Sequence, residues 1–407
     1  MRLKAIGVLL VLGMAAGCAT IGSPKAGHTF GSDMKFLKQH TDVVVLSDAS
    51  GKAQVAVVPQ MQGRVMTSSA NGAKGQSFGW INRELIASGE TVEHMNAFGG
   101  EDRFWLGPEG GQFSIFFEKG VPFDLDHWFT PAEIDTEPFE LVSRSGPTAV
   151  FRKTMKLRNY SGTVFDLRVD REVRVLERDE AAQKLGLSLD SSVKMVAFES
   201  NNRVTNTGQD AWKPETGLLS IWILGMLTPS PATTVVIPFI VGPETRFGPP
   251  VNDSYFGKVP ADRLVVKDGV LFFSGDGQYR SKIGLTPRRA KNVAGSYDAA
   301  NQVLTIVQYN KPRRAAKYVN SMWELQEHPY RGDVINSYND GPPEPGAKPM
   351  GPFYELETSS PAAELDPGQD ILHTHRTFHL TGSEASLEPV AKALLGVSIA
   401  EITAALP

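Results

Sequence analysis

Short apolar segments separated by Gly, Pro, Asn and Asp follow one another along the chain from about residue 40 to residue 382. The clearest, 164–176, alternates apolar and polar residues, which is typical of a strand with one buried face. At 265–271 the pair Asp268-Gly269 separates two β-branched runs and predicts a tight hairpin. No helical segments alternate with these strands, so we expect an all-β fold, a large antiparallel two-layer β-sandwich.

Helical signals concentrate at the C-terminal end of the chain, over residues 383–407. Ser383 and Ser398 each precede apolar residues spaced three or four positions apart, which predicts two short capped helices. One more short helix is predicted at 179–186. Because no linker interrupts 40–382, we expect a single domain there, followed by a short helical tail.

The composition limits the partners that such a sandwich can have. The 407 residues include 41 Lys and Arg against 45 Asp and Glu, a formal net charge of −4. Nucleic-acid binding needs a clustered basic face, so we expect no nucleic-acid partner. The sole cysteine of the sequence is Cys18, which excludes an intrachain disulfide and any multi-cysteine metal site.

Residues 1–17 have the pattern of an export signal. Basic residues precede a short apolar run, and Ala-Ala-Gly stands directly before Cys18. The segment resembles a bacterial lipoprotein signal, with 18–39 as the lipidated cysteine and a tether; an ordinary secretory signal with an incidental cysteine is the alternative. No later segment reaches the roughly 20 apolar residues of a membrane span. We expect an exported body, lipid-anchored through Cys18 to the outer membrane of a Gram-negative host and facing the periplasm or the cell surface.

The densest polar segment is 94–111, where two glycine pairs stand among carboxylates, an arginine, a histidine and a tryptophan. Glycine lets the backbone approach a ligand closely, and the polar groups can pair with the hydroxyls of a polyhydroxylated ligand. An aromatic face suits the apolar face of a sugar ring. A tight structural loop with an internal arginine–carboxylate bridge is the alternative. The candidate site residues here are His94, Asn96, Glu101, Asp102, Arg103, Trp105 and Glu109.

A second polar cluster covers 323–341. On its predicted strand, Asn336 shares a face with Tyr338, and Ser337 shares the other face with Asn339. A polar turn with Asx caps at 339–341 is the structural alternative. The candidate site residues of this cluster are His328, Asn336 and Asn339.

A third cluster covers 353–361, where Glu355 and Glu357 share one strand face and Tyr354 and Leu356 share the other. A carboxylate inside a cleft can act as a general base if burial or a neighbouring carboxylate raises its pKa. A solvent-facing edge strand is the alternative.

Three histidines, 373, 375 and 379, fall on one face of a predicted strand at 370–380. Imidazoles two residues apart can share a metal with a carboxylate from a neighbouring strand. His373 and His375 are therefore candidate ligands of a divalent metal, while surface or hydrogen-bonded histidines are the alternative. No other cofactor is required.

The order of motifs is similar to that of the galactose mutarotase-like superfamily, whose fold is a large two-layer antiparallel supersandwich. The segments that carry this resemblance are 59–65, 206–208, 356–357 and 365–368. More narrowly, 99–105, 333–341 and 353–361 are similar to an uncharacterised family of exported bacterial proteins within it. The resemblance covers about residues 40–382.

The resemblance implies a sugar-binding cleft. In aldose 1-epimerases of this fold a glutamate takes the proton of the anomeric hydroxyl, and Glu357 matches its place best, with Glu355 second. The acid histidine usually stands in a Gly-x-His-x-aromatic stretch, but Ser220 occupies its place in 217–222. The acid would then come from elsewhere, and the candidates are His94, His328, His373 and His375. By the same resemblance Arg103 would bind hydroxyls, and Trp105 or Trp222 would stack on a ring.

These observations together predict a carbohydrate-active lipoprotein with acid/base chemistry at a sugar carbon, as in an epimerase or mutarotase. Its partner would be a mono- or oligosaccharide. A non-catalytic glycan-binding lipoprotein is one alternative, and a polysaccharide lyase or glycosidase on the same fold is another. A protein-binding module would instead require 99–111 to lie far from the other polar clusters.

Overall fold

The computed structural model describes residues 29–312, 316–344 and 346–407. The predicted signal and Cys18 lie outside the described residues, so the lipid anchor stays a prediction. Within the described part of the chain, no helix combines the length and apolar character that a membrane span requires.

The strands of the described residues form three antiparallel sheets. The small sheet has the order β1 (Val44–Ser47), β2 (Gln54–Val58) and β3 (Arg64–Ser69). The five-stranded sheet has the order β13 (Ser281–Leu285), β16 (Ile335–Asn339), β17 (Tyr354–Ser359), β9 (Ser220–Leu227) and β4 (Arg103–Gly107). The ten-stranded sheet has the order β11 (Leu264–Lys267), β12 (Val270–Ser274), β10 (Thr233–Pro238), β14 (Val293–Asp298), β15 (Val303–Tyr309), β18 (Asp370–Thr381), β8 (Lys194–Asn206), β7 (Val164–Val175), β6 (Thr148–Arg158) and β5 (Glu140–Ser145).

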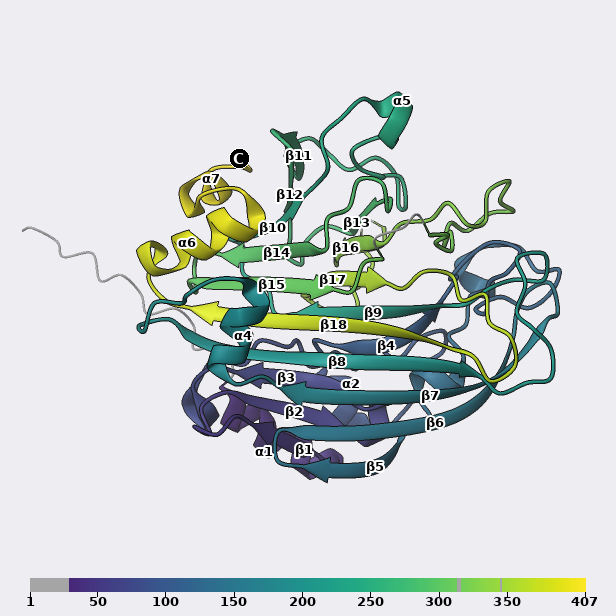
Figure 1. The fold of residues 1–407 in the computed structure, drawn as a ribbon, viewed down its shortest axis with the longest axis horizontal. Helices are drawn as coiled ribbons and strands as arrows, with labels where there is room; N and C mark the ends of the chain where they lie inside the picture. Colours follow the sequence, from purple (N-terminus) through teal and green to yellow (C-terminus); the bar gives the residue numbers. More distant parts are fainter. Residues whose placement is uncertain (1–28, 313–315, 345) are drawn as a thin grey trace, which may run out of the picture.

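Helices are short and lie around the sheets. The α-helices are α1 (Phe30–His40), α2 (Arg83–Ser88), α3 (Ala132–Asp135), α4 (Arg178–Leu185), α5 (Glu244–Phe247), α6 (Glu384–Leu395) and α7 (Ile399–Thr403). Three-residue 3-10 helices cover Pro59–Met61, Gly72–Lys74 and Leu125–His127. Figure 1 shows the long strands of the ten-stranded sheet side by side, with α6 and α7 together at one end of the molecule.

The five-stranded and ten-stranded sheets pack face to face, which confirms the predicted all-β, two-layer antiparallel sandwich. Ile223 of β9 and Leu356 of β17 belong to the apolar clusters between the two sheets. The small sheet continues the five-stranded layer through a bridge between Val65 and Asp102. The helices α4, α6 and α7 cover the opposite face of the ten-stranded sheet with a separate apolar cluster.

Several local predictions are confirmed. Asp268 and Gly269 join β11 to β12, and α4 lies at the predicted short helix. Ser383 caps α6, and Ser398 caps α7 through a capping box with Glu401. The 383–407 tail therefore packs as a helical pair on the ten-stranded sheet.

Two segments differ from the sequence-based expectation. The tether predicted through residue 39 ends earlier, because Thr29 caps a helix whose residues Phe30, Met34 and Leu37 are buried against β2 and β3. The segment 103–107, expected as part of a glycine-rich loop, is the edge strand β4. Gly99, shortly before this strand, has a φ of 98°, and a Cβ on Gly99 would collide with the carbonyl oxygen of Trp80.

Candidate active site

A cleft of about 300 Å³ lies on the outer face of the five-stranded sheet, away from the ten-stranded sheet. Its volume is at the lower end of the range of ligand pockets. All eight residues of the central strand β9 are buried. The ten-stranded sheet covers one face of this strand, and loops cover the other. The strand residues that form the floor are Arg103, Trp105, Trp222, Leu224, Met226, Tyr338, Glu355 and Lys282.

The sheet register brings the floor residues together. Glu355 of β17 lies opposite Met226 on one side and opposite Tyr338 on the other, and Tyr338 in turn lies opposite Lys282. One row away, Glu357 lies opposite Leu224, which pairs with Arg103 on β4. Because side chains alternate along a strand, both rows project toward the cleft while Tyr354 and Leu356 face the core.

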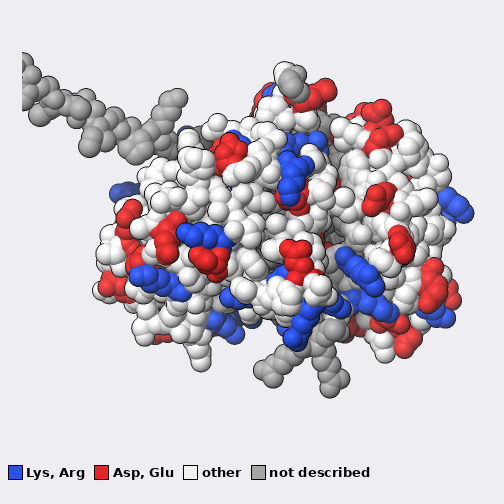
Figure 2. All heavy atoms as spheres, turned by 90° about the horizontal axis from the view of Figure 1, so that it is seen from above, with Lys and Arg blue, Asp and Glu red and all other residues white. Residues whose placement is uncertain are grey.

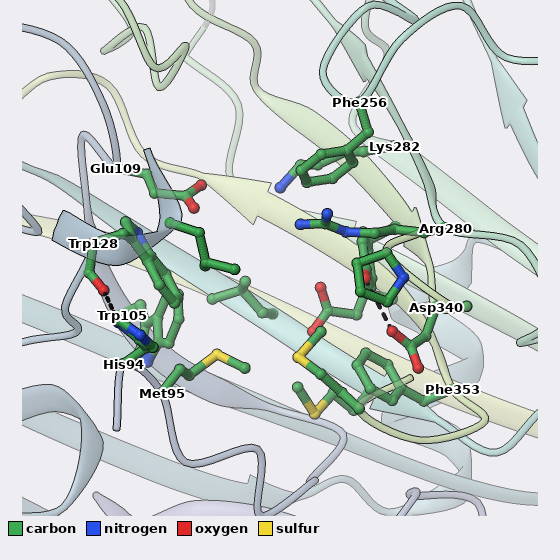
Figure 3. Close-up of a pocket in the computed structure, with 18 of the residues that line it drawn as sticks. His94, Met95, Trp105, Glu109, Trp128, Phe256, Arg280, Lys282, Asp340 and Phe353 are labelled. Carbon is green, nitrogen blue, oxygen red and sulfur yellow. Dashed lines mark hydrogen bonds between the residues drawn. The ribbon is translucent and has the colours of Figure 1, made fainter. Parts of the chain in front are cut away.

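Tryptophans line one side of the cleft. The ring of Trp128 stacks between Phe116 and Trp323, with centroid distances of 5.8 Å to each. Trp105 packs edge-on against Trp222 at 5.6 Å. Figure 3 shows His94, Trp105 and Trp128 on one side of the cleft, and Phe256, Arg280, Lys282 and Asp340 on the other. The indole nitrogens of Trp105 and Trp128 are buried without a hydrogen-bond partner among the described residues, so polar donors remain available at this aromatic wall.

Glu355 is the buried carboxyl group that reaches the cleft from the floor. Arg103 donates a hydrogen bond to it at 3.1 Å, and the same guanidinium lies 4.2 Å from the ring centroid of Trp105. Burial raises the pKa of Glu355 to about 8, because the opposing pull of Arg103 is partly offset by the neighbouring Glu357 carboxylate. Glu355 is therefore mostly protonated at neutral pH and can donate a proton.

Glu357 lies beneath the cleft surface. One of its oxygens accepts hydrogen bonds from the indole nitrogen of Trp222 at 2.9 Å and from the Lys282 ammonium at 3.1 Å. The other oxygen has no hydrogen-bond partner among the described residues. The neighbouring Glu357 carboxylate is one of the causes that raise the pKa of Glu355, as expected where two carboxyl groups lie close together.

Lys282 and Glu109 complete the charged part of the site. Burial lowers the pKa of Lys282, but the carboxylates of Glu357, Glu109 and Glu355 outweigh this effect and leave the pKa raised. Burial raises the pKa of Glu109, which Lys282 partly offsets. Figure 3 shows the Glu109 carboxyl facing Lys282 across the cleft. Among the carboxyl groups that line the cleft, Glu355 therefore stands on the floor and Glu109 on the wall.

Several sequence-predicted residues stand in this cleft and others stand elsewhere. The cleft collects His94, Arg103, Trp105, Glu109, Trp222 and Glu355, with Glu357 beneath its floor. His328 is exposed, with a side chain 48% accessible, and does not line the cleft. Asn336 belongs to a small adjoining cavity that includes Ser220 and Asp333.

The remaining candidates of the 94–111 segment are occupied by structural partners. Asn96 accepts and donates hydrogen bonds within its loop and to Asp135. Glu101 pairs with His379 at 2.5 Å, and Asp102 pairs with Arg171 at 2.5 Å, both between the sheets. These contacts correspond to the structural alternative for these three residues.

Asn339 is also held by its surroundings. Its side chain accepts from the Gly277 backbone and donates to Asp276 and to the carbonyl of Tyr279. Asn339 therefore fixes the loop before β13, which carries Arg280 into the cleft.

His373 and His375 meet a hydroxyl group instead of a carboxylate. Both rings lie 2.8 Å from Oγ1 of Thr358. Burial lowers the pKa of His373 to about 3 and that of His375 to about 4. No group of three or more His, Cys, Asp or Glu suited to a metal occurs in the described ranges. The third histidine, His379, pairs with Glu101, so the strand supplies hydrogen bonds between the sheets.

Sequence reasoning missed the basic side of the cleft. Arg280 lies directly before β13 and Lys282 is its second residue, in a segment for which the sequence predicted no site. The alternation of these two basic residues with Ile283 and Leu285 was the available signal of a strand with one polar face. Trp128 likewise lies in a loop with no regular pattern around it.

The model of a family of unknown function, DUF6786, matches residues 28–406. No curated protein matches the sequence. Among solved structures, a putative aldose 1-epimerase from Escherichia coli K12 is similar at 12% identity and a TM-score of 0.49, covering 84% of this chain and 99% of that one.

Two further structures show the same degree of similarity. The Slr1438 protein from Synechocystis sp. PCC 6803 has 12% identity and a TM-score of 0.46, covering 84% of this chain and 96% of its own. A galactose mutarotase related enzyme from Lactobacillus acidophilus has 9% identity and a TM-score of 0.44, covering 83% and 97%. Likenesses of this degree carry no conclusion about activity.

Proposed function

The chain belongs to DUF6786, a family of unknown function, and we propose that its cleft binds a saccharide and transfers protons at the anomeric centre. The observation that carries the proposal is the buried Glu355 carboxyl group, which lies beside Arg103 and Glu357 at the floor of a cleft lined by tryptophans. A carboxyl group with a pKa of about 8 is matched to proton transfer near neutral pH. Aromatic walls with few polar groups suit a sugar ring.

In this proposal Glu355 is the acid and Glu109 is the base. Glu355 donates its proton to the ring oxygen of the sugar, and the bond from that oxygen to the anomeric carbon breaks. The Glu109 carboxylate takes the proton of the anomeric hydroxyl, which becomes the carbonyl oxygen of the open chain. After rotation about the adjacent carbon–carbon bond, the same steps in reverse close the ring as the other anomer and return both protons.

Glu357 and Lys282 then act as positioning residues. Glu357 helps to raise the pKa of Glu355, and its own side chain is fully covered by its neighbours. Lys282 neutralises the charge that remains on the pair when Glu355 gives up its proton, because its ammonium lies 3.1 Å from Glu357. The sequence resemblance gave Glu357 the base role, whereas burial favours Glu355 as the group that touches the sugar.

The test compares sugar conversion with sugar binding. The rate of α-to-β conversion of D-galactose and D-glucose is followed by polarimetry, and binding of the same sugars by saturation-transfer NMR. Glu355→Gln and Glu109→Gln should abolish the catalysed rate and retain binding, while Glu93→Gln at the exposed rim should retain both. If the wild-type protein neither binds nor interconverts these sugars or their acidic derivatives, the proposal fails.

A non-catalytic glycan-binding protein is the second candidate. It is favoured because Lys282 already forms an ion pair with Glu357 and also faces Glu109 across the cleft. Such a cluster can serve as a fixed set of hydrogen-bonding groups without moving protons. In that case the wild-type protein binds the sugars and leaves their rate of anomer conversion at the uncatalysed value.

A further inference from the structure

Arg280 differs from every other cation that lines the cleft. Four basic side chains line it: Arg103, Arg280, Lys282 and Lys348. Arg103 pairs with Glu355 and Lys282 with Glu357, both at 3.1 Å, and Lys348 pairs with Glu84 at 3.5 Å. The Arg280 guanidinium has no ion pair and no hydrogen bond to any of the residues that the structure describes.

The surroundings of Arg280 hold its charge in the cleft. Its guanidinium lies 4.0 Å from the ring centroid of Phe256, in the geometry of a cation–π contact. Figure 3 shows the guanidinium directed toward the middle of the cleft, beside Lys282 and in front of Asp340. Arg280 also lines an adjoining hollow of about 270 Å³ that shares Glu109, Phe256 and Lys282 with the cleft. The fork of this side chain is therefore presented to whatever occupies the cleft.

The nearest carboxylate is committed elsewhere. Asp340 accepts from the Tyr338 hydroxyl at 2.9 Å and from the Gly351 backbone at 2.8 Å. Glu109 lies on the opposite wall, where its carboxyl group faces Lys282. Of the Lys and Arg side chains that line the cleft, Arg280 is therefore the one without an anionic partner among the described residues.

From this arrangement we infer that the ligand is an acidic saccharide whose anionic group pairs with Arg280. A guanidinium fork binds carboxylate, phosphate or sulfate groups through two parallel hydrogen bonds. Arg280 and Lys282 are two residues apart on one strand face, about 7 Å along the strand. Lys282 stands in the same row of the sheet as Glu355, with Tyr338 between them, and Arg280 and Glu355 both line the cleft. An anionic group on the sugar would pair with Arg280 while the anomeric carbon lies near Glu355.

This inference rests on the proposed saccharide site and makes it more specific. Neutral sugars would occupy the same aromatic wall but would leave Arg280 without a partner. An acidic sugar removes that unpaired charge and gains a charge-assisted contact.

The experiment measures binding by calorimetry and anomer conversion by NMR for D-galacturonate, galactose 6-phosphate, galactose 6-sulfate and D-galactose. The wild-type protein should bind at least one of the acidic sugars about tenfold or more tightly than D-galactose. The three acidic sugars distinguish a carboxylate from a phosphate or sulfate requirement, and inorganic phosphate alone tests for an anion site that ignores the sugar.

Three variants locate the preference. Arg280→Gln should remove it and leave D-galactose unchanged within about twofold, and Arg280→Lys should retain part of it because the charge remains. Arg246→Gln is the matched control, since Arg246 is also a cation above an aromatic ring, at 5.0 Å from Phe247, but is exposed and outside the cleft.

Three outcomes overturn the inference, and they are distinguishable from one another. Equal binding of neutral and acidic sugars by the wild-type protein and by Arg280→Gln overturns it and leaves the proposed function intact. Absence of binding and conversion for all four sugars overturns the inference together with the proposed function. Tight binding of inorganic phosphate, with no contribution from the sugar, also overturns it.

Discussion

The two faces of the five-stranded sheet both carry buried charges, but they treat them differently. On the core face, Arg171 donates to Asp102, to Asn202 and to the carbonyl of Gly63, while Ser200 donates to the other oxygen of Asp102. On the cleft face, one oxygen of Glu357, one nitrogen of Arg103 and the Trp105 indole nitrogen have no partner among the described residues.

The difference holds for the network around Asp102 and Arg171, whose side-chain atoms are all paired, and not for the whole core face, where Glu101 and His373 each keep one buried atom without a partner among the described residues. A buried polar network whose members are all satisfied stabilises one arrangement of the two sheets. A buried network with open donors and acceptors is costly unless water or a ligand completes it. The neighbouring residues Asp102 and Arg103 belong to the two different networks, because successive side chains of a strand point to opposite faces.

The largest effect is expected on the core face. Asp102→Ala leaves Arg171 as an unpaired buried charge, and the free energy of unfolding should fall by about 3–5 kcal/mol. Urea denaturation measures this change, and Asp370→Ala provides the control because its pair with Arg203 is exposed and worth about 0–1 kcal/mol. Equal effects of the two substitutions would contradict the distinction between the two faces.

The next effect is on activity alone. Glu355→Gln removes the proton donor but keeps a neutral side chain of the same shape, so the catalysed conversion rate should fall about hundredfold or more. At about pH 4.5, where the wild-type Glu355 is protonated and Gln copies its shape and its acceptor oxygen, the free energy of unfolding should stay within about 0.5 kcal/mol of the wild-type value. A large loss of stability in this variant would place Glu355 with the structural charges of the core face.

A smaller effect is expected at Thr358, whose hydroxyl contacts both buried imidazoles on β18. Thr358→Val preserves the shape and leaves those imidazoles without this partner, which should cost about 1–3 kcal/mol of unfolding free energy. Thr377→Val is the matched control, because the Thr377 hydroxyl is buried without a partner in the described chain. A control variant as unstable as Thr358→Val would indicate that the hydroxyl contacts are unimportant.

The smallest effect is a difference in pH dependence between the two faces. Glu355 has a folded-state pKa of about 8, above its ordinary value, so its contribution to stability is complete below about pH 4.5 and is lost as the pH rises through about 8. The slope is at most about 1.4 kcal/mol per pH unit for one proton. Unfolding free energies of wild type and Glu355→Gln should therefore diverge between about pH 4.5 and 8, and the conversion rate should fall above about pH 8.

The buried histidines of the core face have the opposite sign. His373 and His375 have folded-state pKa values of about 3 and about 4, below their ordinary value. They bind protons only after unfolding, so the stability that they contribute is present above about pH 6.5 and is lost as the pH falls toward those values. A Glu355→Gln protein that lost its acid sensitivity would conflict with this assignment.

The sequence predicted the strand-rich sandwich and its helical tail, because alternation and serine caps are local signals that the packing follows. The shared face of Glu355 and Glu357 was predictable in the same way, from the period of a strand. The sequence could not predict which face of the sheet forms the cleft. The cleft depends on contacts between distant parts of the chain, such as that between Arg103 and Glu355, which are 252 residues apart. Glu101 and Asp102 were misplaced for this reason: their partners, His379 and Arg171, lie on distant strands.

The strand order of the five-stranded sheet also constrains how occupancy of the cleft is felt by the rest of the molecule. The strands of this sheet lie far apart in the sequence, from β4, which begins at Arg103, to β17, which ends at Ser359. No short fragment of the chain therefore contains the whole floor of the cleft. Figure 2 shows acidic and basic side chains interspersed over the surface that is seen from above. A bound ligand should accordingly raise the melting temperature of the entire two-sheet body in one cooperative step, which makes thermal-shift screening a direct route to the sugar it prefers.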